Sequence, residues 1–193
     1  IRRQVKLSAP VPHNWSDFLR SDQNKTELFD FLSDQLLLVQ LPLTKHIVTT
    51  HGTSVLSSKP DYNATRIEPC SHEEADTRVI LHCAEQARAG YKKLLLRTVD
   101  SDVAILAVSY QQQIDCDELW LAFGTGKHFR YIAAHELANA LGPDRCAALP
   151  MFHAFTGCDT VSAFTGRGKK TCWDVWSSYA PVTAAFIALS HQP

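Results

Sequence analysis

The chain has 193 residues, of which 45% are apolar and 20% are charged, and this composition excludes a disordered tail. With 19 basic and 20 acidic residues its formal net charge is −1, so any attraction to a polyanion must come from local clusters of cations. The length is that of one ordinary domain, and we expect residues 1–193 to form a single unit.

Six cysteines are spread along the chain without a C-x-x-C pair, and several stand among apolar residues. Reduced cysteines in such positions behave as small core residues, which predicts free thiols and a location inside the cell, the nucleus included. No stretch reaches the ~20 apolar residues of a membrane span, and no secretion signal opens the chain. The sequence therefore predicts no membrane contact.

The first third of the chain carries few strong signals. Residues 1–22 are polar and contain prolines, which predicts an irregular lead-in. Apolar residues recur at helical spacing over 24–38 and predict an amphipathic helix. The segment 45–52 is typical of a short strand, and 54–69 is typical of a turn-rich connector.

A second helix is expected to begin at Ser71. Ser71 would be its N-cap, with Glu74 three residues later in a capping box, and the helix would run to about Ala89 before Gly90. The apolar run over 93–99 then predicts a strand that is buried on both faces.

Helices and strands continue to alternate after this strand. We expect a helix over 102–113, strands over 118–124 and 127–132 joined by a hairpin turn at their glycines, and a helix over 133–142. This alternation indicates an α/β fold whose central sheet is mainly parallel. Sites in such sheets form beyond the carboxyl ends of the strands.

Acidic residues stand where these elements meet. Asp76 begins an apolar stripe of its helix, either as a first-turn residue favoured by the helix dipole or as a group aimed inward. Asp100 and Asp102 directly follow the expected strand; an extended chain would put both on one face, while one of them could instead be the N-cap of the next helix. Asp159 follows an apolar segment and is either a turn residue or a ligand.

Converging carboxylates require a cation between them. Two unit charges about 4 Å apart repel by about 4 kcal/mol at an effective dielectric of 20. Oxygen ligands favour Mg²⁺ or Mn²⁺ over zinc. One or two such ions are the usual means of activating water in phosphodiester cleavage. No histidine, His153 included, pairs with a cysteine at zinc-finger spacing, and we expect Cys158 to be a packed thiol.

Three segments resemble the acidic motifs of PIN-like nucleases of the flap endonuclease and XPG type: EADT at 74–77, TVDSDVAIL at 98–106 and TGCDTVSAFTGRGKKT at 156–171. The family has, in the same order, a helix with E-x-E/D, a strand ending in D-x-D, and G-x-D before a helix-hairpin-helix element with a glycine-rich basic turn. The chain also resembles mobile-element-associated proteins that carry HEEADTR, FGTGKHFR and ALPMFHAFTGCDT. The resemblance covers most of the chain, with its diagnostic part at 71–176.

The resemblance implies a three-layer α/β/α sandwich, a nuclease activity and a set of site residues. The catalytic residues would be Asp76, Asp100, Asp102 and Asp159, and the metal ligands would be these four with Glu74. The family's motif matches Glu74 as the ligand, whereas helical periodicity favours Glu73, because Glu73 shares the face of Asp76. Nucleic acid, with DNA expected before RNA, would be bound by the basic loop, whose amides and cations meet phosphates: Gly166, Arg167, Gly168, Lys169 and Lys170. A solvated turn is the alternative interpretation of this loop.

One departure separates the chain from the family pattern. The family's sheet begins with a strand that carries an N-terminal catalytic aspartate, and no counterpart stands before Asp22. We expect that strand and its aspartate upstream of Ile1, so that the full-length protein is the metal-dependent nuclease. The rival hypothesis is a catalytically inactive PIN-like binding or assembly module of a transposon-derived protein.

Overall fold

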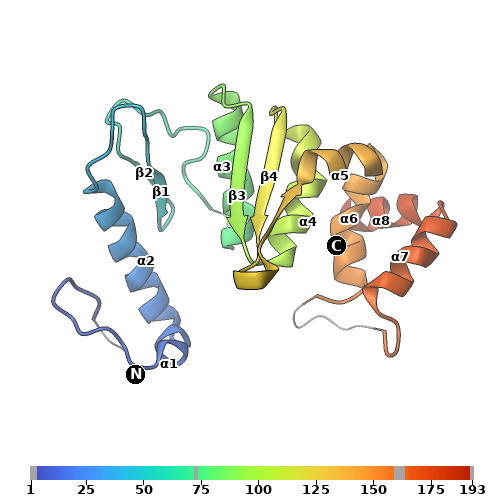
Figure 1. Ribbon diagram of the computed structural model, residues 1–193, viewed down its shortest axis with the longest axis horizontal. Helices are drawn as coiled ribbons and strands as arrows, with labels where there is room; N and C mark the ends of the chain where they lie inside the picture. The colour runs from blue at the N-terminus through green and yellow to red at the C-terminus, as the bar shows by residue number, and fades with distance from the viewer. Residues whose placement is uncertain (1–3, 72–73, 159–163, 192–193) are drawn as a thin grey trace. The chain divides into compact units, whose positions relative to one another are not determined.

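The computed structural model describes residues 4–71, 74–158 and 164–191. The chain divides into two compact units, Ile1–Glu73 and Glu74–Pro193 (Figure 1). This corrects the expectation of a single unit. The physical reason is that the second unit closes a hydrophobic core of its own, since all described members of the main core cluster come from residues after Glu74.

The first unit pairs two helices with a small hairpin. Its elements are α1 (Trp15–Leu19), α2 (Asp22–Leu37), β1 (Val48–His51) and β2 (Ser54–Ser57). The two strands are antiparallel and joined by a tight turn that contains Gly52 at a φ of 58°. The structure confirms the predicted helix and the first strand, and it adds β2 where a connector was expected.

The lead-in over 1–22 is not wholly irregular, because it contains α1. Asn14 caps this helix, and its side-chain oxygen accepts a hydrogen bond from the amide of Asp17 at 3.1 Å. The rings of Trp15 and Phe18 meet edge to face with centroids 5.6 Å apart. An N-cap and one aromatic pair are thus enough for a single helical turn in a polar stretch.

The second unit is a mixed α/β structure. Its elements are α3 (Ala75–Arg88), β3 (Lys93–Thr98), α4 (Ser101–Tyr110), η1 (Gln111–Gln113), β4 (Glu118–Phe123), η2 (Gly126–His128), β5 (Arg130–Ala133), α5 (Ala134–Leu141), α6 (Pro143–Phe155), α7 (Lys169–Ser178) and α8 (Val182–His191). The predicted alternation of helices and strands is confirmed. No helix within the described ranges is long and apolar enough to cross a membrane.

The sheet of the second unit has the strand order β3-β4-β5 (Figure 1). β3 and β4 are parallel, as predicted, whereas β4 and β5 are antiparallel, so the described sheet is mixed instead of mainly parallel. The reason is the short connection between β4 and β5, where the predicted hairpin turn reverses the chain. Gly124 has a φ of 84° there, and a Cβ atom on it would lie 2.6 Å from the carbonyl oxygen of His128.

Strand β3 lies at the edge of this sheet. Leu96 is 3% exposed but Leu95 is 63% exposed, which corrects the prediction that both faces of the strand are buried. The parallel partner β4 covers one edge of β3, and the carboxyl end of β3 leads into α4. Helix α4 packs against α3, α5 and α6.

Candidate metal centre

Two predicted ligands stand on the junction between β3 and α4. Asp100 is the N-cap of α4, and its Oδ1 accepts a hydrogen bond from the amide of Asp102 at 2.9 Å. The amide of Asp100 in turn donates to Oγ1 of Thr98 at 3.0 Å. The chain therefore bends into the helix instead of staying extended, and the interpretation of one aspartate as an N-cap is confirmed. Both carboxylates still lie at the start of the helix, Asp100 at the N-cap and Asp102 in the first turn.

Asp76 brings a third carboxylate to the same place from the first turn of α3. One oxygen from each of Asp76, Asp100 and Asp102 lies within 4.8 Å of the others. Asp100 is exposed, whereas Asp76 and Asp102 are half-buried. The structure thus brings together three acids that were predicted as ligands and that come from two separate segments of the chain.

These three residues fit a small hard cation. Mg²⁺ binds oxygen at about 2.0–2.1 Å and so spaces its ligand atoms about 3–4 Å apart, which the cluster reaches with small side-chain movements. Without a cation, each pair of carboxylates at about 4 Å repels by about 4 kcal/mol at an effective dielectric of 20, less where water screens the pair. The cluster is therefore of the kind that a divalent ion stabilises.

Glu74, another predicted ligand, is not part of this cluster. Glu74 is the exposed N-cap of α3, with no side-chain capping bond, so the expected capping box that begins at Ser71 is wrong. The helix begins at Ala75, and the Glu74 carbonyl accepts a hydrogen bond from Oγ1 of Thr77 at 3.1 Å. Asp159 lies outside the described residues.

The structure adds two residues that sequence reasoning assigned no role at the site. Nε2 of His153 lies 2.8 Å from Oδ1 of Asp102, and the thiol of Cys158 lies within 4.8 Å of a ligand atom of each. Helix α6 carries His153 and ends at Phe155, after which Gly157 adopts a φ of 93°. That left-handed turn directs the chain back, so that Cys158 returns toward the imidazole. A glycine between the two was the one sequence signal for this arrangement.

The expected basic loop contributes to the fold as well as to the surface, and its two lysines, Lys169 and Lys170, begin helix α7 instead of lying in a loop. Nζ of Lys169 donates to the carbonyl of His153 at 2.7 Å and to Oγ1 of Thr156 at 3.0 Å. Lys170 forms an exposed ion pair with Asp174 at 2.9 Å, one helical turn away. Arg167 is exposed. The three cations expected to bind phosphate therefore differ, because Lys169 already satisfies two acceptors at the end of α6.

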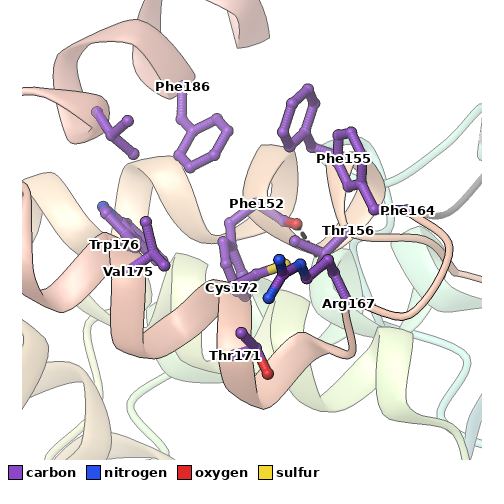
Figure 2. A pocket seen from close by; sticks show the side chains of 11 residues that line it. Phe152, Phe155, Thr156, Phe164, Arg167, Thr171, Cys172, Val175, Trp176 and Phe186 are labelled. Atoms are coloured by element: carbon purple, nitrogen blue, oxygen red, sulfur yellow. Dashed lines mark hydrogen bonds between the residues drawn. The ribbon is translucent and has the colours of Figure 1, made fainter.

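An apolar hollow of about 430 Å³ lies beside this loop (Figure 2). Aromatic side chains of α6, α7 and α8 line it, and Figure 2 shows Arg167 extending toward Phe152 and Cys172. The rings of Phe152 and Trp176 stack with centroids 4.8 Å apart. No acid is among the described lining residues, so the hollow offers no metal ligands of the carboxylate kind.

Comparison with protein families, with curated proteins and with solved structures finds no match for this chain. The function has to be inferred from the residues of the site itself.

Proposed function

We propose that the second unit belongs to a metal-dependent phosphodiesterase that cleaves nucleic acid, with DNA expected before RNA. The observation that carries the proposal is the meeting of Asp76, Asp100 and Asp102 within 4.8 Å. Glu74 and Asp159 stay as predicted further ligands. In this proposal the unit has a PIN-like three-layer arrangement and comes from a mobile-element-associated protein.

The position of the acids in the fold supports this function. Asp100 and Asp102 follow the carboxyl end of β3, which is parallel to β4, and ligand sites in α/β sheets form at such ends. Asp76 lies in the first turn of α3, where the helix dipole favours a negative side chain. The acids thus come from rigid elements, as a site of fixed geometry requires.

The protein's own groups hold the acids in place for the reaction. Asp100 is fixed by its capping bond to the amide of Asp102, and Asp102 is fixed by His153. Mg²⁺ or Mn²⁺ bound between them would supply an activated water and neutralise charge at the scissile phosphate. Because only small side-chain movements are needed to receive an ion, much of the binding geometry exists beforehand.

Nucleic acid would be positioned by the exposed part of the basic loop. Arg167 and Lys170 are both exposed, and Gly168 is the N-cap of α7 without a side chain to cap the helix amides. Such amides and cations can contact phosphate oxygens without reading the bases. Lys169 would act mainly by holding the loop to the end of α6.

The test is a titration of the chain with Mn²⁺, followed by thermal unfolding and by cleavage of labelled DNA and RNA. The wild-type chain should show saturable stabilisation, about 2.7 kcal/mol at a hundredfold excess over Kd. The Asp100→Asn variant should lose it, whereas the matched surface variant Asp174→Asn should keep it. Saturable stabilisation without cleavage would support the inactive binding module, and no stabilisation at all would contradict the proposed site.

A further inference from the structure

A second set of possible ligands adjoins the carboxylate cluster. Its members are Asp102, His153 and Cys158, each with one ligand atom within 4.8 Å of the other two. Asp102 belongs to both sets. The second set differs in chemistry, because it offers one oxygen, one imidazole nitrogen and one sulfur instead of three oxygens.

This donor set selects a different class of metal. Thiolate and imidazole are ligands for zinc and neighbouring transition metals, whereas Mg²⁺ binds oxygen almost exclusively. A tetrahedral ion with bonds of about 2.0–2.3 Å spaces its ligand atoms about 3.3–3.6 Å apart. The present 2.8 Å between Nε2 of His153 and Oδ1 of Asp102 would need to open by only about half an ångström.

The surrounding structure holds these donors toward one another. His153 is only 8% exposed, and its Nε2 is directed at the carboxylate of Asp102. Its backbone carbonyl accepts a hydrogen bond from Nζ of Lys169 at 2.7 Å, which fixes the end of α6. Gly157 at a φ of 93° then places Cys158 on the same side.

A hydrogen bond alone accounts for His153 and Asp102, but it does not account for the third member. Cys158 is half-buried and directly follows Gly157, whose positive φ turns the chain after the end of α6. An oxygen, a nitrogen and a sulfur donor therefore converge on one place, and they come from α4, from α6 and from the turn after α6. Such convergence is what a zinc-type ion requires of a protein.

We propose that Asp102, His153 and Cys158 form a second binding site, for a zinc-class divalent ion, which shares Asp102 with the carboxylate cluster. Three protein ligands leave the fourth tetrahedral position open, as in sites where zinc holds water or a substrate oxygen. The ion would join the first turn of α4 to the end of α6 directly before the basic loop. This site goes beyond the proposed phosphodiesterase function and does not require it.

Cobalt is the probe, because Co²⁺ replaces zinc and gives a near-ultraviolet charge-transfer absorption only when a thiolate binds it. The full chain, reduced and free of zinc, should develop this band on addition of one equivalent of Co²⁺. Zn²⁺ should abolish the band, and a large excess of Mg²⁺ should leave it. The Cys158→Ser variant should lose the band, because it lacks the thiolate. The His153→Gln variant should bind Co²⁺ at least about tenfold more weakly, since loss of even an outer-shell partner of a metal ligand costs about 10–100-fold in affinity.

The control is Cys172→Ser, which changes another half-buried cysteine of the same unit and should keep the band. Circular dichroism of each variant shows whether it is folded, and His153→Gln retains a donor to Asp102. A band that persists in folded Cys158→Ser, or no band in the wild-type chain, would overturn the proposal.

The two metal proposals can fail separately. Asp76→Asn and Asp100→Asn should remove stabilisation by Mn²⁺ but leave the cobalt band, because neither residue belongs to the second set. Mn²⁺ stabilisation without a cobalt band would retain the phosphodiesterase site and reject the zinc-class site. A cobalt band without Mn²⁺ stabilisation would retain the zinc-class site and reject the phosphodiesterase site.

Discussion

The imidazole of His153 and the carboxylate of Asp102 are 2.8 Å apart, although the two residues are 51 positions apart in the chain. Their side chains are 11% and 27% exposed, so much of the contact is shielded from water. The contact joins the end of α6 to the first turn of α4. Asp102 is consequently held by a residue from a distant helix, whereas Asp100 is held by its own helix.

Replacing Asp102 should separate its structural role from its charge. Asp102→Ala leaves the buried imidazole of His153 without this acceptor, which should lower the free energy of unfolding by about 1–3 kcal/mol. Asp102→Asn keeps an acceptor oxygen and should cost less, yet it should lose stabilisation by Mn²⁺. Urea unfolding with and without Mn²⁺ measures both effects. Equal stability of the two variants would show that the hydrogen bond is unimportant.

Replacing Asp100 should distinguish the helix cap from the metal ligand. Asp100→Ala removes the capping oxygen of α4 and should lower stability by about 1 kcal/mol. Asp100→Asn retains a good cap and relieves repulsion from Asp76 and Asp102, so its unfolding temperature in chelator should equal or exceed that of the wild-type chain. Thermal unfolding in EDTA is the measurement. A lower temperature for Asp100→Asn would argue that these carboxylates do not repel.

The two lysines of the basic loop should respond differently to substitution. Lys169→Met removes two hydrogen bonds at the end of α6 and should cost about 1–3 kcal/mol in unfolding free energy. Lys170→Met removes only an exposed pair with Asp174, which is worth at most about 0.5 kcal/mol. If Lys170 contacts phosphate, its loss should weaken nucleic-acid binding and reduce the salt dependence by roughly one counterion. Fluorescence anisotropy at several salt concentrations tests this, and unchanged binding would favour the solvated turn.

Local signals in the sequence predicted the elements of the second unit from α3 to α5, but not the helices α6, α7 and α8. The apolar run that became β3, the strand of β4 and the glycines at the ends of α3 and α5 each act within a few residues. Asp100 also followed a local rule, because aspartate at a strand-to-helix junction is a favourable N-cap. The meeting of Asp76 with Asp100 and Asp102 followed from their places at the ends of neighbouring elements.

Features that depend on distant contacts were not predictable in the same way. The exposure of Leu95 depends on β3 being an edge strand, and a run of leucines does not show this. The site at His153 and Cys158 depends on the packing of α6 against α4 and on the turn at Gly157. Spacing rules for zinc fingers describe ligands within one short motif, and here the third ligand, Asp102, comes from another helix.

Burial of Cys83 should make stability depend on alkaline pH. Burial raises the pKa of this thiol from 9.0 to about 11, and the neighbouring Cys116 contributes in the same direction. The folded state therefore favours the neutral thiol. The contribution of the neutral Cys83 thiol to the free energy of unfolding is fully present below about pH 9, and it is lost as the pH rises to about 11. Two pKa units correspond to at most about 3 kcal/mol.

Urea unfolding of the wild-type chain and of Cys83→Ala, under reducing conditions across this pH range, measures the effect. Both proteins lose stability as other groups titrate, so the informative quantity is the difference between their unfolding free energies. That difference should fall as the pH rises, because only the wild-type chain must keep a thiol neutral in the half-buried position next to Cys116. Parallel curves for the two proteins would show that the Cys83 thiol has the same pKa in the folded and unfolded states.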